Sequence, residues 1–173
     1  YKYVFRTTTM ATQENVAAAR YIADNFPGLK TFSGVNPNYA WGQDAWSDFT
    51  EAMKILKPDA QIATNVTPKL GAGQYNTEVS ALLGSGAEVM QNSLWGGDLE
   101  AFLLQSAPRG LLSKIPNIII CGDTVLERLA AQIPDGTIIG ARRPNGPFAP
   151  PTALNKWFHK AFKERYKVTP VYA

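Results

Sequence analysis

The stretch Ile115-Pro116-Asn117-Ile118-Ile119-Ile120-Cys121 is a nearly continuous apolar run. A strand inside a parallel sheet is covered by helices on both faces, so its sequence is apolar throughout rather than alternating. The residues that follow include Thr124 and Glu127, which have the spacing of a capping box, and we expect this box to open a helix that reaches Ile133. A buried strand that leads directly into a helix is the repeating unit of a parallel α/β sheet.

The same alternation of strand and helix continues on both sides of this unit. Short apolar segments predict further strands at 29–35, 60–66, 87–90 and 137–141. Of the helices predicted between them, the clearest has an apolar stripe at helical spacing and stops at Pro58; the stripe consists of Ala45, Phe49, Ala52, Met53 and Leu56. The sequence therefore predicts an α/β fold with a doubly wound, mostly parallel sheet, right-handed crossovers and helices on both faces.

Capping residues predict where three of the other helices begin. We expect Thr12, Asp98 and Thr152 to be N-caps, because short polar side chains at these positions precede apolar residues at helical spacing. The expected inward residues are Val16, Ala19, Ala23 and Phe26 after Thr12, then Val79, Leu82 and Leu83, then Leu99, Phe102, Leu103 and Ser106 after Asp98, and finally Leu154, Trp157, Phe158, Ala161 and Phe162 after Thr152.

Length and composition are those of one globular domain. The 173 residues are 45% hydrophobic and 18% charged, and the net charge of +3 is scattered along the chain. The four Trp and seven Tyr are also spread out, so nucleic-acid binding is not indicated. No apolar run of about 18 residues is found, so we expect no direct insertion into a membrane. We assign residues 1–173 to a single α/β lobe.

Both ends of the chain have the sequence pattern of segments from within a longer chain. Residues 1–6 have the alternating pattern of a strand already under way, and residues 167–173 leave a helix in an extended, proline-containing segment. We therefore expect the natural protein to continue beyond both ends. The Arg142-Arg143 pair precedes a stretch with four prolines, 144–151, which predicts a connector.

Ligands of doubly wound sheets collect outside the carboxyl ends of the strands, so the loops that follow the strands are the candidate site. The strand at 29–35 is followed by Asn36-Pro37-Asn38-Tyr39-Ala40-Trp41-Gly42. This short loop carries two large aromatic side chains, and we expect at least one of them to face the crevice. An alternative for Trp41 is that it only packs against the start of the helix.

The loop after 87–90 reads Gln91-Asn92-Ser93-Leu94-Trp95-Gly96-Gly97-Asp98. Its glycine pair precedes a helix, whose first backbone N–H groups can bind a carboxylate. The pair matches neither a dinucleotide fingerprint nor a Walker loop, so a nucleotide is not indicated. After 115–121 comes Asp123, which either holds a ligand ammonium or is an acid favoured by the helix dipole.

No set of residues with catalytic or metal-binding spacing is present in the sequence. We expect Cys121, the one cysteine, to be a small buried apolar residue, and we place the one histidine, His159, in the last helix, far along the chain from any strand end. One cysteine also excludes a disulfide within the chain. The pattern favours a binding protein without a cofactor or a metal over an enzyme.

Several motifs together resemble the type I periplasmic solute-binding proteins of ABC importers, in the branch that binds branched-chain amino acids. They are Tyr3-Val4-Phe5-Arg6-Thr7, the loop Asn38-Tyr39-Ala40-Trp41-Gly42, Pro68-Lys69 before Tyr75, and Gly96-Gly97-Asp98 with Phe102, Gln105, Gly110 and Leu111 behind it. The resemblance extends over nearly the whole chain. It implies the second lobe of a two-lobe protein that closes on its ligand, a periplasmic or other extracytoplasmic location, and a membrane permease as partner.

The resemblance also implies a ligand-binding set in this lobe, namely Trp41, Ser93, Leu94, Trp95 and Asp123, to which the aromatic loop adds Tyr39 as a candidate ligand-binding residue. The implied ligand is a small carboxylate, either an amino acid or an aromatic acid. The chain departs from the branched-chain binders at Asn36, where they usually have an acid, at Trp41, where they usually have Tyr, and at Asp123, where Glu is often found. Trp41 and Trp95 together suit a flat or larger ligand.

Two other functions remain open from the sequence. A ligand-sensing lobe of a receptor or regulator with the same fold would share every residue discussed above. A small α/β enzyme is the remaining alternative, and it would have to use Cys121, Asp123 or His159.

Overall fold

A computed structural model describes residue 3 and residues 9–141 and 149–170 of the chain. Its centre is one parallel sheet in the order β2-β1-β3-β4-β5. The strands are β1 (Thr31–Val35), β2 (Gln61–Val66), β3 (Val89–Asn92), β4 (Asn117–Ile119) and β5 (Ile138–Ile139). The predicted doubly wound α/β fold is therefore confirmed.

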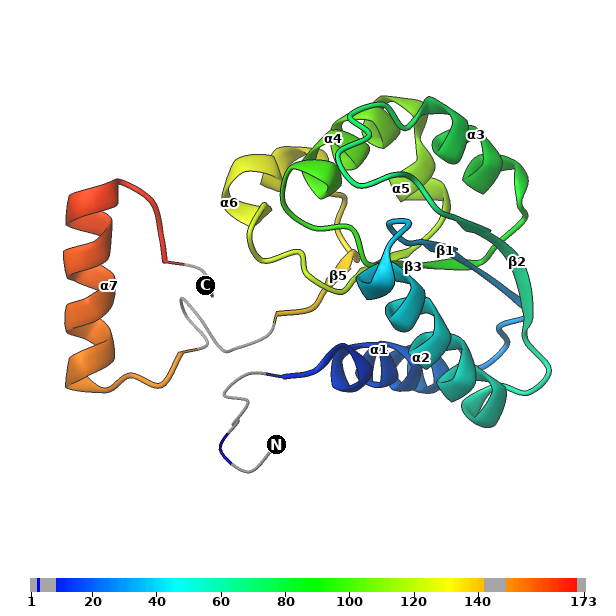
Figure 1. Ribbon diagram of the computed structural model, residues 1–173, viewed down its shortest axis with the longest axis horizontal. Helices are drawn as coiled ribbons and strands as arrows, with labels where there is room; N and C mark the ends of the chain where they lie inside the picture. Colours follow the sequence, from blue (N-terminus) through cyan, green and yellow to red (C-terminus); the bar gives the residue numbers. More distant parts are fainter. Residues whose placement is uncertain (1–2, 4–8, 142–148, 171–173) are drawn as a thin grey trace.

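Helices lie on both faces of the sheet, with α1 and α2 on one face and α3, α4, α5 and α6 on the other (Figure 1). They are α1 (Ala11–Asn25), α2 (Ala40–Leu56), α3 (Asn76–Gly84), α4 (Gly96–Ser106), α5 (Leu111–Lys114), α6 (Leu126–Leu129) and α7 (Ala153–Tyr166), with 3-10 turns at Ala107–Arg109 and Ala130–Gln132. None of the described helices is both long and apolar enough to cross a bilayer.

Helix α2 has the apolar stripe that the sequence predicts. Ala45, Phe49, Ala52 and Met53 are buried, and the helix ends at Leu56, shortly before Pro58. Its Trp46 lies over Gly34 of β1, where a Cβ atom would overlap the indole ring, so the glycine makes room for the tryptophan. This packing fixes α2, and with it the loop that leads into α2, against the sheet.

The predicted start of α1 is wrong by two positions, and its predicted buried face is only partly correct, since Ala19 is buried but Val16 is not. The N-cap is Met10 rather than Thr12, and the Gln13 side chain accepts a hydrogen bond from the Met10 N–H at 2.9 Å. Val16 is 41% exposed, whereas Asn15 is buried and its Oδ1 accepts a hydrogen bond from Gln91 Nε2 at 3.0 Å. A buried polar pair replaces the expected apolar contact, which hydropathy alone does not predict.

Two other capping predictions are also wrong. Helix α4 begins at Gly96 with Trp95 as its N-cap, because the Asp98 carboxylate is directed to the loop after β2. Helix α6 begins at Leu126 with Val125 rather than Thr124 before it, and the helix expected to reach Ile133 changes to a 3-10 turn after Leu129. Side-chain contacts between distant loops, or local turn geometry, take precedence over the capping pattern here.

The strands are shorter than predicted or shifted. The apolar run 115–121 contributes only Asn117–Ile119 to the sheet, since Ile115 belongs to the buried end of α5 and 120–121 to the loop that follows. The strand predicted at 87–90 is observed two residues later, at Val89–Asn92. Buried residues around a strand are apolar whether or not they pair, so the pattern marks the core better than the strand ends.

The last helix, α7, begins as predicted but does not pack as predicted. The Thr152 hydroxyl accepts a hydrogen bond from the Asn155 N–H at 3.2 Å, which confirms the N-cap. None of its residues is buried, and Leu154 and Trp157 are 73% and 65% exposed, because α7 stands apart from the sheet (Figure 1). An amphipathic pattern identifies an apolar face but not what covers it. Apart from Tyr3, the strand expected at 1–6 lies outside the described residues, as does the Arg142-Arg143 pair.

Candidate ligand-binding site

Two loops at the carboxyl edge of the sheet form the candidate site. One follows β1 and leads into α2, and the other follows β3 and leads into α4. β1 and β3 are neighbours in the sheet, and Val35 pairs with Asn92 at their last positions. The loops therefore start side by side, and the first turns of α2 and α4 lie at the same edge.

Two hydrogen bonds cross between these loops. The Trp41 indole N–H donates to the Ser93 carbonyl oxygen at 3.0 Å, and the Trp95 indole N–H donates to the Tyr39 hydroxyl at 2.9 Å. Four of the six residues that the sequence assigns to ligand binding thus come together. Because each bond joins residues more than 50 positions apart, the geometry of the edge is set by the fold and not by either loop alone.

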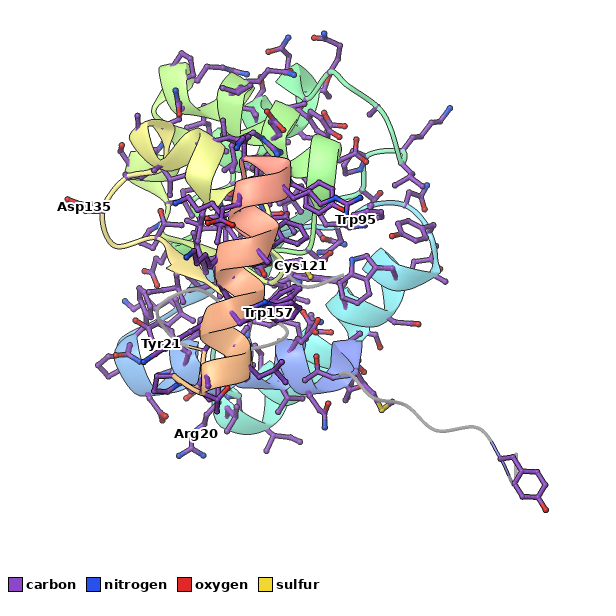
Figure 2. All side chains as sticks on the ribbon, turned by 90° about the vertical axis from the view of Figure 1, so that its left-hand side faces the viewer. Arg20, Tyr21, Trp95, Cys121, Asp135 and Trp157 are labelled. Atoms are coloured by element: carbon purple, nitrogen blue, oxygen red, sulfur yellow. The ribbon has the colours of Figure 1, made fainter. Side chains whose placement is uncertain are left out.

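The three aromatic residues differ in burial. Trp41 is partly buried and packs against the core formed with α1 and α2, so its ring also anchors the start of α2. Trp95 is 47% exposed, and Figure 2 shows it at the surface of the molecule. Tyr39 is partly exposed. The accessible aromatic surface of this edge therefore comes mainly from Trp95, since Tyr39 and Trp41 are both only partly exposed.

Ser93 and Leu94 are placed inside the protein. The Ser93 hydroxyl donates to Asn36 Oδ1 at 2.6 Å, and the Ser93 side chain is fully buried. Leu94 is 1% exposed and belongs to the core beneath α4, while its N–H donates to Asn92 Oδ1 at 2.9 Å. Both residues therefore support the loop after β3 from inside the protein.

Asn36 is a residue of this edge that the sequence did not assign to the site. Its side-chain amide donates to Asn65 Oδ1 at 2.8 Å, and its own Oδ1 accepts the Ser93 hydroxyl. Its backbone N–H donates to the Val66 carbonyl oxygen at 3.0 Å. Asn36 thereby joins the carboxyl ends of β2, β1 and β3. The only feature of the sequence that could have indicated this role is the position of an amide side chain directly after a buried strand.

A second network holds the loop after β2. The Asp98 carboxylate accepts the Gly71 N–H at 2.8 Å and the Tyr75 hydroxyl at 2.7 Å. Gln105 accepts the Tyr75 N–H at 2.8 Å and donates to the Gly73 carbonyl oxygen at 2.9 Å. Burial of Tyr75, followed by its hydrogen bond to Asp98, raises the pKa of its hydroxyl well above the ordinary value. The loop is thus fixed to α4 just behind Trp95.

Asp123, the sixth predicted residue, lies in the loop that follows β4 and is 8% exposed. So little of its surface faces outward that it is a limited direct partner for a ligand ammonium. The neighbouring Cys121 is buried at 1% exposure, whereas His159 lies on α7 and contacts the ring of Phe158. Among the described residues, no group of three or more His, Cys, Asp and Glu side chains could hold a metal ion.

The edge offers a ligand two kinds of contact. Trp95 presents an aromatic surface, and the first turn of α4 begins at Gly96 without a side-chain cap, so its backbone N–H groups are available to an acceptor such as a carboxylate. Beside Trp41 lies a polar pocket of about 410 Å³ lined by Thr9, Met10, Ala11, Thr12, Asp44, Ser47 and Asp48.

The sequence profile of the periplasmic binding protein family matches residues 1–172, so the chain belongs to this family. The solved structures that it resembles are type I periplasmic binding proteins of ABC transporters. No significant match is found among curated proteins.

Three solved structures illustrate the likeness. A solute-binding protein of an ABC transporter from R. palustris, in complex with benzoate, has a TM-score of 0.78 and 22% identity over 97% of this chain and 44% of its own. A solute-binding protein from Rhodopseudomonas palustris BisB5, in complex with 3,4-dihydroxy benzoic acid, has a TM-score of 0.74 and 24% identity over 98% of this chain and 46% of its own. The leucine-, isoleucine-, valine-, threonine-, and alanine-binding protein from Brucella ovis has a TM-score of 0.67 and 16% identity over 98% of this chain and 42% of its own. The chain thus spans less than half the length of each.

Proposed function

We propose that this chain is one lobe of an extracytoplasmic solute-binding protein that delivers a small carboxylate ligand to the membrane permease of an ABC importer. The observation that carries the proposal is the pair of hydrogen bonds between the loops after β1 and β3, at the edge where doubly wound sheets bind ligands. Membership of the periplasmic binding protein family supports the same role.

In the proposed protein the ligand lies in a cleft between this lobe and a second lobe. This accords with the finding that the chain spans less than half the length of the solved structures it resembles. The loops described above then form one wall of the site. Because one wall covers only part of a ligand, we expect the chain alone to bind more weakly than the whole protein.

The proposed ligand is an amino acid or an aromatic acid. The exposed Trp95 suits an apolar or aromatic side group, and the uncapped first turn of α4 suits the carboxylate. Proteins of similar fold carry benzoate or 3,4-dihydroxy benzoic acid in their complexes, and another is named for leucine, isoleucine, valine, threonine and alanine. We propose binding without catalysis, since the side-chain hydrogen bonds of these two loops join the loops to each other and to the strand ends.

A thermal-shift screen of the full natural protein tests the proposal. Leucine, phenylalanine, benzoate and hydroxybenzoates form the panel, and leucinamide and benzamide are the matched controls that lack the carboxylate. We expect at least one carboxylate to raise the Tm, since a ligand at 100 times its Kd stabilises the folded state by about 2.7 kcal/mol. We expect its amide counterpart to raise the Tm much less. If none of the ligands in the panel raises the Tm, the proposal is contradicted.

A further inference from the structure

We propose that Tyr39 and Trp95 together select a ligand with a planar aromatic ring over an aliphatic ligand of the same size. The inference rests on the proposed function and narrows it to one ligand class. It is carried by the unusual position, exposure and mutual hydrogen bond of these two side chains.

Both residues are helix N-caps. Tyr39 precedes α2 and Trp95 precedes α4, and neither side chain makes a capping hydrogen bond. Ser, Thr, Asp or Asn at these positions would stabilise the helices by accepting an N–H of the first turn. These two aromatic side chains therefore do not stabilise α2 or α4 by capping them.

Core packing does not account for Trp95 either. Its side chain is 47% exposed, while the next residue inward along the loop, Leu94, fills the core. An exposed indole in a loop between a strand end and a glycine pair would ordinarily be free to change rotamer. Here its N–H is held by the Tyr39 hydroxyl at 2.9 Å, so the ring is held in one orientation before any ligand arrives.

The hydrogen bond leaves a polar group beside the ring. A tyrosine hydroxyl can donate one hydrogen bond and accept others, and that of Tyr39 accepts from Trp95. Within the part of the chain that the structure describes, no acceptor for the Tyr39 hydroxyl hydrogen is found. The pair thus offers a flat apolar face and, at its rim, a donor for an oxygen atom of the ligand.

This arrangement favours a planar ring. A ring that stacks on the indole gains an aromatic interaction in addition to the burial of apolar area, whereas a puckered aliphatic ring of similar size gains only the burial. Because the indole is already held in place, little side-chain entropy is lost on binding. We expect a preference of about 2- to 10-fold for the planar ligand.

Calorimetric titration of the full natural protein with benzoate and cyclohexanecarboxylate tests this. The two ligands share the carboxylate and a six-membered ring, and phenylalanine and leucine form a second pair. We expect the aromatic member of at least one pair to bind more tightly. Trp95→Leu should abolish the preference, Trp95→Phe should keep part of it, and Tyr39→Phe should weaken binding of a hydroxybenzoate. Trp157→Leu, at another exposed tryptophan on α7, should change nothing.

The outcomes separate the inference from the proposed function. Equal affinity for both members of each pair, or binding of the aliphatic members alone, overturns the inference and leaves the solute-binding role intact. A preference that survives in Trp95→Leu also overturns it. If no carboxylate binds the unmutated protein, the inference and the proposed function fail together.

Discussion

The Ser93 hydroxyl donates to Asn36 Oδ1 over 2.6 Å, and this bond joins the ends of β3 and β1 inside the protein. Asn36 also donates to Asn65 of β2, so three neighbouring strands are connected at the edge that carries the proposed site. The hydrogen bonds among Asn36, Asn65 and Ser93 thus support the loops that carry the aromatic side chains at the surface.

A double-mutant cycle of Asn36→Ala and Ser93→Ala should measure their interaction. We expect each single variant to lower the free energy of unfolding by about 1–3 kcal/mol, because it leaves a buried partner without its hydrogen bond. The double variant should lose about 1 kcal/mol less than the sum. Urea unfolding monitored by circular dichroism gives the three values, and strict additivity would show that the two side chains do not interact.

Trp41→Phe should distinguish the contribution of the indole N–H hydrogen bond from that of the packing of the aromatic ring. The variant keeps an aromatic ring but loses the indole N–H that donates to the Ser93 carbonyl oxygen. We expect unfolding to become easier by about 1 kcal/mol and the affinity for the ligand to fall, because the two loops are no longer joined at this point. Trp157→Phe, on exposed α7, is the control and should leave both quantities unchanged. Unchanged values in Trp41→Phe would show that the N–H contributes nothing.

Gly42→Ala should disturb the loop after β1. A Cβ atom at position 42 would overlap the Pro37 carbonyl oxygen and lie 2.8 Å from Pro37 Cδ, so the backbone has to shift. We expect a loss of about 1–3 kcal/mol in unfolding free energy, together with weaker ligand binding. Gly84→Ala in α3 is the matched control, since its Cβ would meet nothing within 4 Å. Equal stability of the two variants in thermal melts would exclude the predicted overlap.

Tyr75 should make stability depend on alkaline pH. Its pKa in the folded protein is raised by burial and by the hydrogen bond to Asp98, whereas an unfolded tyrosine titrates at about 10. Above that pH the unfolded chain loses a proton that the folded protein retains. The contribution of Tyr75 to the free energy of unfolding therefore falls as the pH rises. Unfolding free energies measured from pH 8 to 11 should decline less in Tyr75→Phe. Tyr21→Phe, at the surface of α1, should decline like the unmutated protein.

Much of the fold could be predicted from the sequence because it depends on local pattern. The stripe Ala45, Phe49, Ala52 and Met53 predicted α2 and its buried face, and the run around Ile118 predicted a strand covered on both sides. These features need only the period of a helix or the apolarity of a buried strand. The start of α7 at Thr152 could be predicted because an N-cap is a contact between residues of one helical turn.

What failed depends on partners distant in the sequence. Asp98 was expected to cap α4, but its carboxylate binds the Gly71 N–H and the Tyr75 hydroxyl. Asn15 was not expected to be buried, since its partner Gln91 lies 76 positions away. The apolar face of α7 was assigned to the core although nothing in its sequence indicates what it packs against. A polar side chain is informative only once its partner is known.

The candidate site was predicted in the same uneven way. The rule that ligands gather at strand ends selected the loops with Tyr39, Trp41 and Trp95, and the structure brings these loops together. Ser93 and Leu94 were included on the family resemblance, which did not distinguish side chains that face outward from those that support the loop, and both are buried. Asn36 was omitted because its role depends on Asn65 and Ser93.

A crystal structure of the full natural protein with the tightest ligand from the screen tests the central claim most directly. The account predicts that the ligand lies at the carboxyl edge of the sheet and contacts Trp95 and the loops after β1 and β3. A ligand found elsewhere would contradict it. One such place is the apolar pocket of about 200 Å³ between α1 and the strands β4 and β5, lined by Tyr21 and Ile138, which leaves Trp95 without a ligand contact.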